Sequence, residues 1–257
     1  MNKKVPFKTD YDLVKAIDKY SSYLLCTSTI MIIVIFIFNN LTSYLSFGLF
    51  LSKLNCVLIT SYVIIEILKE YLLFNARRKK RFDLIDNALG SSLTTEHSFN
   101  YYTNDNIEQG IFKLAVNGFE NVFFSLNIIR AMLPKALTIN AVILLIFLSS
   151  AIYGFNNIVV LIIQLSLPVI MLKQIFRLIF LVNHLENIYH RYCSIFNDLK
   201  LNPYKLRKTP EMICNILEYE STLSWANILM SEKDYNKMND LLSARWTEIK
   251  KNYGIII

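Results

Sequence analysis

Four ionisable side chains stand inside, or at the end of, long apolar stretches of this sequence. Glu66 and Glu70 lie four residues apart in one stretch, and Lys173 and Arg177 lie four apart in another. Residues at this spacing share one face of a helix, and ionisable groups inside a membrane are costly unless they are paired or hydrated. We therefore predict that the two acids face the two bases as intramembrane charge pairs. The alternative is that all four are interfacial residues whose long side chains reach out to water.

A run of five cations follows the first of these stretches: Arg77, Arg78, Lys79, Lys80 and Arg81. Each cation near an anionic membrane surface contributes about 1 kcal/mol of attraction. Arginine side chains also hold phosphate groups through paired hydrogen bonds. The run is therefore predicted to bind lipid or phosphate. The alternative is an ordinary anchor that fixes the topology.

Polar side chains next to an aromatic stripe form a third candidate, a cytoplasmic ligand groove. The polar residues are Tyr101, Tyr102, Asn117, Glu120 and Asn121, and the aromatic ones are Phe112, Phe119, Phe123 and Phe124. The alternative is that the polar residues simply form the solvated face of an amphipathic helix.

Catalytic and metal-binding patterns are missing from the sequence. The histidines and the cysteines share no metal-ligand spacing, and they are His97, His184, His190, Cys26, Cys56, Cys193 and Cys214. The sequence has no Gly-x-Ser-x-Gly, no His-Glu-x-x-His and no phosphate-binding Gly-Lys-Ser/Thr motif. We therefore expect no enzyme activity, no cofactor, no metal and no disulfide.

Four apolar stretches must position these residues: 23–38, 55–74, 136–153 and 158–172, the last continuing with charges to residue 182. Each approaches the roughly 20 apolar residues that cross a bilayer core about 30 Å thick. Hydrophobic residues make up 54% of the 257-residue chain. The connections 39–52 and 154–157 carry no charge. The sequence thus predicts an all-α integral membrane protein with four transmembrane helices in two hairpins.

Charge sets the predicted orientation. The net charge is +7, and the Lys and Arg residues gather before, between and after the two hairpins. Because such residues are retained on the cytoplasmic side, we predict a multi-pass inner-membrane protein with both termini in the cytoplasm. The predicted segments are an amphipathic N-terminal helix (1–20), transmembrane hairpin 1 (21–74), a cytoplasmic helical segment (75–133), transmembrane hairpin 2 (134–182) and a cytoplasmic helical C-terminal segment (183–257).

Helix boundaries can also be predicted. Gly90 should end the helix that continues from the second span, and residues 91–106 should form a loop. Pro134 should break a long amphipathic helix just before the third span. Thr209-Pro210-Glu211 and Ser231-Glu232 should begin two further helices.

The layout and one local pattern resemble a known family. Phe82-Asp83 and Ile85-Asp86-Asn87 follow the basic run directly after the second span. With the two-plus-two arrangement of spans, they resemble the SMODS-associating four-transmembrane effectors of bacterial anti-phage systems. The resemblance implies a membrane effector that senses a cytoplasmic signal through residues 74–133 and 183–257. Such a protein would then disrupt or depolarise the inner membrane and cause abortive infection.

The expected partners follow from the same reading. They are the lipid bilayer, further copies of the chain, and a cytoplasmic activator that is a nucleotide second messenger or a protein. Further copies are expected because four spans leave little room for a pore. No direct binding of nucleic acid is expected.

Three other classes stay open. A stator-like subunit shares the two-plus-two layout, with Pro168 in the fourth span as its local support. A small channel or transporter would use Glu66 or Lys173 to line its pathway. A non-conducting scaffold would recruit a cytoplasmic partner.

Overall fold

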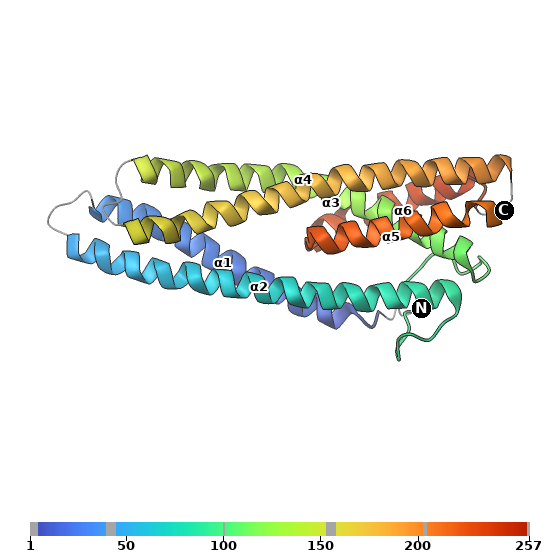
Figure 1. Cartoon of the computed structure of the whole chain (residues 1–257), viewed down its shortest axis with the longest axis horizontal. Coiled ribbons are helices and arrows are strands. Elements are labelled where there is room, and N and C mark those ends of the chain that lie inside the picture. Colours follow the sequence, from blue (N-terminus) through green and yellow to red (C-terminus); the bar gives the residue numbers. More distant parts are fainter. Residues whose placement is uncertain (1–4, 40–44, 100, 153–157, 203–204, 256–257) are drawn as a thin grey trace. The chain divides into compact units, whose positions relative to one another are not determined.

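Helices make up almost the whole structure. The computed structural model describes residues 5–39, 45–99, 101–152, 158–202 and 205–255, and this part of the chain holds no strand. The helices are α1 (Lys8–Asn39), α2 (Leu45–Leu89), α3 (Ile111–Ile152), α4 (Ile158–Leu201), the short 3₁₀ helix η2 (Lys205–Lys208), α5 (Thr209–Ala226) and α6 (Glu232–Asn252), as shown in Figure 1. The predicted all-α class is confirmed.

Most helix ends fall where the sequence places them. Helix α2 ends at Leu89, and Gly90 adopts the left-handed φ of +69° that favours glycine after a helix. Helix α5 carries its proline in the first turn. Ser231 caps α6 by accepting a hydrogen bond from the Asp234 N–H at 3.1 Å.

Two predicted boundaries are wrong. Helix α3 runs from Ile111 to Ile152 straight through Pro134, because a proline removes only one hydrogen bond and neighbouring turns keep the others. Helix α2 begins at Leu45, inside the predicted connection 39–52. The apolar residues after Leu45 therefore belong to the helix and lengthen it.

The chain divides into two compact units. Unit 1 comprises Met1–Tyr11, Phe74–Leu133 and Arg177–Ile257, and unit 2 comprises Asp12–Leu73 and Pro134–Phe176. Helices α2, α3 and α4 each contribute to both units.

In unit 2, α1 and α2 pack against each other as antiparallel helices. On α2 the buried residues from Gly48 to Tyr62 alternate at spacings of four and three, and those on α1 lie seven, four or three residues apart, as in a coiled-coil seam. The buried set is Val14, Ser21, Ser28, Ile32 and Ile35 on α1, and Gly48, Ser52, Asn55, Ile59, Tyr62 and Leu73 on α2. Half of this seam is small or polar, whereas large apolar side chains such as Ile30, Val57 and Ile64 are exposed. Unit 2 is therefore more apolar outside than along this seam.

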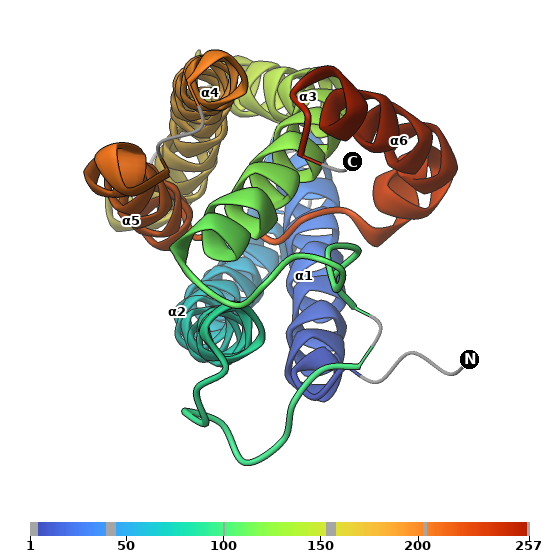
Figure 2. The same cartoon turned by 90° about the vertical axis from the view of Figure 1, so that its right-hand side faces the viewer.

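Unit 1 has a core of aromatic rings. The ring of Phe119 on α3 lies 5.3 Å, centroid to centroid, from the rings of Tyr192 and Phe196 on α4 and of Trp246 on α6. Helix α3 comes close to α4 at Gly118, where a Cβ would lie only 2.5 Å from the Tyr192 hydroxyl. Figure 2 shows α5 beside α4, and the Arg191–Glu218 ion pair joins these two helices.

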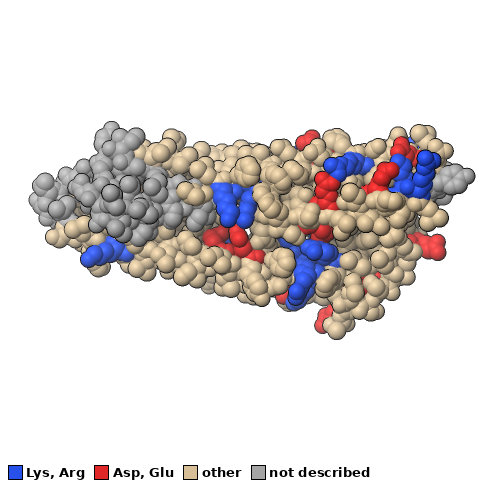
Figure 3. Space-filling model, in the orientation of Figure 1, with Lys and Arg blue, Asp and Glu red and all other residues tan. Residues whose placement is uncertain are grey.

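Two helices are long and apolar enough to cross a membrane, α2 over Ser46–Leu89 and α3 over Ile111–Leu145. Only 33% and 11% of their most apolar windows is buried, whereas the core helix of a soluble protein is mostly buried. On the face drawn in Figure 3, charged side chains are sparse over a long stretch of the described surface. The sequence agrees, because Lys53 is the only charged residue between Lys19 and Glu66.

Candidate functional site

Polar side chains from three helices of unit 2 meet at Glu66. Its carboxylate accepts hydrogen bonds from Lys69 at 2.6 Å, from Gln174 on α4 at 3.2 Å and from the Ser21 hydroxyl on α1. Lys69 also binds Asp18 of α1 at 2.9 Å. Three helices therefore meet at one acidic group, with a single lysine between two carboxylates.

Helix α4 presents Gln174 to Glu66, and its neighbour Lys173 is exposed. The ion pair of Glu66 is made with Lys69, and Glu66 forms none with Lys173 among the described residues. Glu70 and Arg177 are both half-buried, and their pairing stays a prediction. Helix α4 does contact this face of α2, but the α4 side chain that binds Glu66 is the amide of Gln174 and not a base.

A second polar pair lies further along the same seam. The Ser28 hydroxyl donates to the Asn55 amide oxygen at 2.8 Å, and both residues are fully buried. The Asn55 amide nitrogen is buried without a hydrogen-bond partner in the described part of the chain. Sequence reasoning missed Asp18, Ser21, Ser28 and Asn55. Asp18, Ser21 and Ser28 lie three and seven residues apart and therefore share one face of α1, and this spacing of polar residues in an apolar helix is the signal that could have found them.

In unit 1 the five cations of the basic run separate. Arg77 is 7% exposed, and its guanidinium donates hydrogen bonds to the carbonyls of Leu223 and Ile228 at the end of α5. A cation at a helix C-terminus satisfies unpaired carbonyls and is favoured by the helix dipole. Burial lowers the pKa of Arg77, although nearby Tyr11, Tyr219 and Glu220 raise it. Arg77 thus acts inside the unit.

The other four cations differ in exposure and in partners. Arg81 pairs with Glu220 at 2.9 Å, Lys79 pairs with Asp10 at 2.7 Å, and Arg78 is exposed. Lys80 is half-buried, and although burial lowers its pKa, the nearby Tyr101, Tyr219, Tyr11 and Glu220 raise the pKa overall. The run is therefore not one exposed patch, and lipid or phosphate binding stays a prediction for Arg78, Lys79 and Lys80 only.

The residues predicted to line a ligand groove lie around a buried amide, Asn104. Its nitrogen donates to the Asn117 amide oxygen at 2.9 Å and to Glu120 at 2.7 Å. The Asn117 nitrogen in turn donates to Asn87 on α2 at 3.0 Å. Lys250 of α6 donates to the Asn104 oxygen at 3.3 Å. The five polar side chains come from α2, α3, α6 and the connecting loop.

The outer members of the predicted groove are placed differently. Tyr102 is buried and Tyr101 and Asn121 are half-buried. The prediction left Asn104 out of the groove and missed Lys250, because nothing in the local pattern distinguishes these two from surface residues. The structure thus brings Asn117 and Glu120 together and fills the space between them with Asn104.

Burial shifts two ionisable groups of this network toward their neutral forms. Burial raises the pKa of Glu120, although hydrogen bonds from Thr103 and Asn104 lower it. Burial also lowers the pKa of Lys250, and the charge of Glu120 partly opposes that shift. The network is therefore a buried hydrogen-bond network in which burial disfavours the charged forms of Glu120 and Lys250. Such networks are typical of a structural core or of a conformational switch.

The residues that carry the family resemblance hold the loop after α2. The Asp86 carboxylate accepts from the N–H groups of Leu93 and Thr94 and from the Ser91 hydroxyl, all at 2.7–2.8 Å. Asp83 accepts from the Ser98 N–H at 2.7 Å. Their observed role is to anchor this loop to α2.

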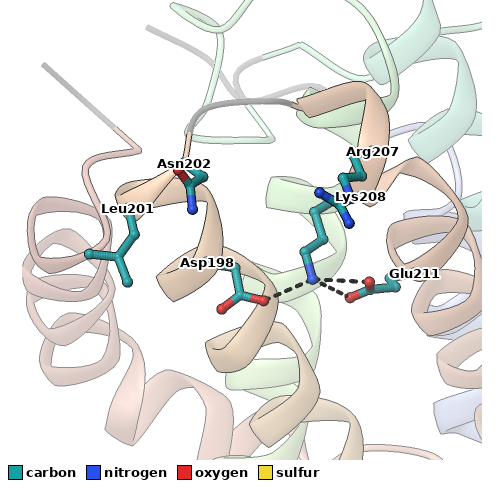
Figure 4. Close-up of a pocket in the computed structure, with 6 residues that line it drawn as sticks. All are labelled: Asp198, Leu201, Asn202, Arg207, Lys208 and Glu211. Carbon is teal, nitrogen blue, oxygen red and sulfur yellow. Dashed lines mark hydrogen bonds and ion pairs between the residues drawn. The ribbon is translucent and has the colours of Figure 1, made fainter.

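A pocket of about 460 Å³ opens in unit 1 between the end of α4 and the start of α5. Figure 4 shows Lys208 between Asp198 and Glu211, at 2.8 Å and 3.0 Å. Asn202, Leu201 and Arg207 complete the lining. The described residues contain no group of three or more His, Cys, Asp or Glu side chains that could hold a metal. All four cysteines are free thiols.

Comparison with known proteins identifies no relative: no protein family, no curated protein and no solved structure matches this chain.

Proposed function

We propose that this chain is a four-span inner-membrane effector that receives a cytoplasmic signal in unit 1 and depolarises the membrane through unit 2. The observation that carries the proposal is the inverted character of unit 2. Its helices expose isoleucine, leucine and valine side chains while they bury Ser21, Ser28 and Asn55. This distribution suits hydrocarbon around the unit and is unfavourable in water.

Charge supports the four-span topology. No charged residue occurs between Lys135 and Lys173, the region that contains the second hairpin. The charged residues concentrate in the stretches that form unit 1, consistent with a cytoplasmic location for this unit. Helices α2, α3 and α4 belong to both units. A rearrangement in unit 1 could therefore reach unit 2 through continuous helices.

A pair of matched substitutions tests whether lipid surrounds unit 2. Ile64 on α2 is 61% exposed and Leu241 on α6 is 54% exposed. In water a lysine at either position is harmless. In hydrocarbon a lysine costs about 3 kcal/mol, so Ile64→Lys should remove much of the protein from carbonate-washed membranes while Leu241→Lys should not. Equal membrane retention of the two variants would contradict the four-span proposal.

Topology can be read from thiol labelling in intact cells. A cysteine introduced by Asn156→Cys, in the uncharged connection 154–157, should react with a membrane-impermeant maleimide added outside. The exposed native Cys214 should react only after permeabilisation. Labelling of Cys214 from outside would show that the orientation is wrong.

The effector activity is tested by expressing the full chain in a bacterial host and following a potential-sensitive dye. We expect depolarisation and growth arrest when the cytoplasmic activator is present, for example during phage infection, and a normal potential without it. A protein that neither depolarises nor protects in any infected host would be a non-conducting scaffold.

A further inference from the structure

The interior of unit 2 contains one apolar layer with polar groups on both sides. Each helix supplies one residue to this layer: Leu25 from α1, Ile59 from α2, Ile143 from α3 and Met171 from α4. Leu25, Ile59 and Ile143 stand at the midpoints of the α1, α2 and α3 stretches that belong to unit 2. The layer therefore lies where the centre of a surrounding bilayer would be.

On one side of the layer is the acidic cluster. Tyr62 is buried one turn from Ile59, and Glu66 lies one turn beyond Tyr62 with its bonds to Lys69, Ser21 and Gln174. Asp18 binds the other side of Lys69. The two carboxylates and one ammonium leave this cluster with a net negative charge.

The hydrogen-bonded pair of Ser28 and Asn55 lies on the other side of the layer. Ser28 and Asn55 are hydrogen-bonded and fully buried, and Ser52 is buried one turn further on. From Ser52 to Lys69 the polar face of α2 extends about 25 Å at 1.5 Å per residue, most of the thickness of a bilayer core. On α2 the apolar layer at Ile59 separates the two polar groups, and on α1 Ile32 and Ile35 are buried beyond Ser28.

Two buried atoms argue against a purely structural seam. Interhelical hydrogen bonds in membranes hold helices together when donors and acceptors match. Here the Asn55 amide nitrogen and the Asn140 amide oxygen on α3 are both buried without partners among the described residues. A buried amide left in this state costs about 1–3 kcal/mol unless water reaches it. Unit 2 therefore contains two buried polar atoms that water could hydrogen-bond, in addition to the polar groups that bind one another.

We propose that unit 2 contains a proton path along its axis, closed by the layer of Leu25, Ile59, Ile143 and Met171. Ionisable residues inside membrane bundles commonly mark such paths, and apolar constrictions close pores by excluding water. In this path Glu66 accepts a proton from water on its own side. When the layer is hydrated, Glu66 releases that proton to water that continues past Asn55, and no other bond is made or broken.

The proposed path carries protons rather than hydrated metal ions. Ile59 is 1% exposed and Met171 is 4% exposed, so these two side chains leave little room for a hydrated cation between them. A transient single file of water is enough to conduct protons. The inference rests on the part of the proposed function that places unit 2 across a membrane. It requires neither an activator nor a role in defence.

Purified full-length protein in liposomes with an internal pH-sensitive dye tests the path. Ile59→Ser makes the layer polar, and we expect about a tenfold faster proton flux than wild type, equivalent to about 1.4 kcal/mol off the barrier. The matched control is Ile64→Ser, the same change at an exposed position of the same helix. Met171→Gln, which preserves the side-chain length, repeats the test if Ile59→Ser does not yield monodisperse protein.

A second substitution assigns the role of Glu66. In the Ile59→Ser background, Glu66→Gln keeps one side-chain oxygen that can accept from Lys69 and Ser21 and removes the proton-carrying carboxylate, so it should restore the slow flux. The path is overturned if Ile59→Ser and Met171→Gln conduct no faster than Ile64→Ser, or if Glu66→Gln leaves their flux unchanged. Cellular depolarisation by wild type with no effect of the layer variants would keep the proposed function and overturn the path. Faster flux through the layer variants in liposomes, without depolarisation of cells by the wild type, would keep the path and overturn the proposed function.

Discussion

The two units bury polar groups for different reasons. Unit 1 surrounds Asn104 with partners on three sides, from Asn117, Glu120 and Lys250. Unit 2 buries Asn55 just as completely but gives it one partner, Ser28. In unit 1 a buried amide joins segments of the fold, whereas in unit 2 it lines a seam between helices whose outer faces are apolar. Burial alone therefore does not specify the role of a polar side chain.

Helix α2 shows the same contrast within one element. Its buried face continues through Ile59, Tyr62 and Leu73 in unit 2 to Ala76 and Asp83 in unit 1. The spacing of buried residues is similar along the helix, but the opposite face changes from apolar to charged. The packing pattern is therefore common to both units. The units differ in the outer face of α2, which is apolar in unit 2 and charged in unit 1.

The largest expected effect breaks the aromatic core of unit 1. Phe119→Ala should lower the free energy of unfolding by about 3–5 kcal/mol, because it leaves a cavity among Tyr192, Phe196 and Trp246. Both tryptophans of the chain lie in unit 1, so denaturation of the full-length protein in detergent can be followed by their fluorescence. Phe99→Ala, at an exposed position, is the control and should change little. Equal effects of the two substitutions would remove Phe119 from the centre of the core.

The next effect separates two neighbouring arginines. Arg77→Ala should destabilise unit 1 by about 2–4 kcal/mol, because the carbonyls of Leu223 and Ile228 lose their donor. Arg78→Ala should cost less than about 0.5 kcal/mol, since Arg78 is exposed. Binding of anionic vesicles should show the opposite order. If Arg77→Ala weakens vesicle binding more than it weakens the fold, the basic run acts as one surface.

Buried asparagines allow a direct comparison of the units. Asn104→Leu should cost about 2–3 kcal/mol, because Asn117, Glu120 and Lys250 lose a partner. Asn55→Leu should stay within about 1 kcal/mol of wild type, because it strands only the Ser28 hydroxyl and removes an unpaired amide nitrogen. Thermal unfolding followed by circular dichroism reports on both units. A larger loss for Asn55→Leu would show that the seam of unit 2 is held by its polar pair.

The smallest effect concerns pH. Burial raises the pKa of Glu120, so the ionised carboxylate destabilises the fold above its folded pKa. This loss fades as the pH falls toward the ordinary value of 4.5. Unit 1 should therefore gain a little stability from Glu120 between pH 7 and pH 5, and Glu120→Gln should remove that gain. An identical pH dependence in the variant would contradict the assignment.

Asp86 provides the opposite sign in the same unit. Its burial raises the pKa, but the hydrogen bonds from Leu93, Ser91 and Thr94 outweigh burial and lower the pKa of Asp86 below 3.8. Its contribution is fully present above that value and is lost only in stronger acid. Asp86→Asn should consequently destabilise the protein at pH 7 and at pH 5 alike, and it controls for general acid effects in the Glu120 experiment.

Local chemistry along the chain accounts for the helical class, most helix ends and the long apolar stretches. These features follow from local chemistry: Gly90, Pro210 and Ser231 act on the backbone beside them, and apolar stretches act by length. The misplaced break at Pro134 has the same origin, because local rules alone do not include the neighbouring turns that keep α3 helical.

Tertiary structure alone decided which polar residues meet. Five adjacent cations look equivalent in sequence, yet packing buried Arg77 at the end of α5 and left Arg78 exposed. Glu66 was predicted to face Lys173 or Arg177 of α4, and it instead binds Lys69, Ser21 and Gln174. The physical reason is that contacts between helices depend on their rotation and register. One residue along a helix turns a side chain by about 100°, and no local pattern specifies that rotation for two helices at once.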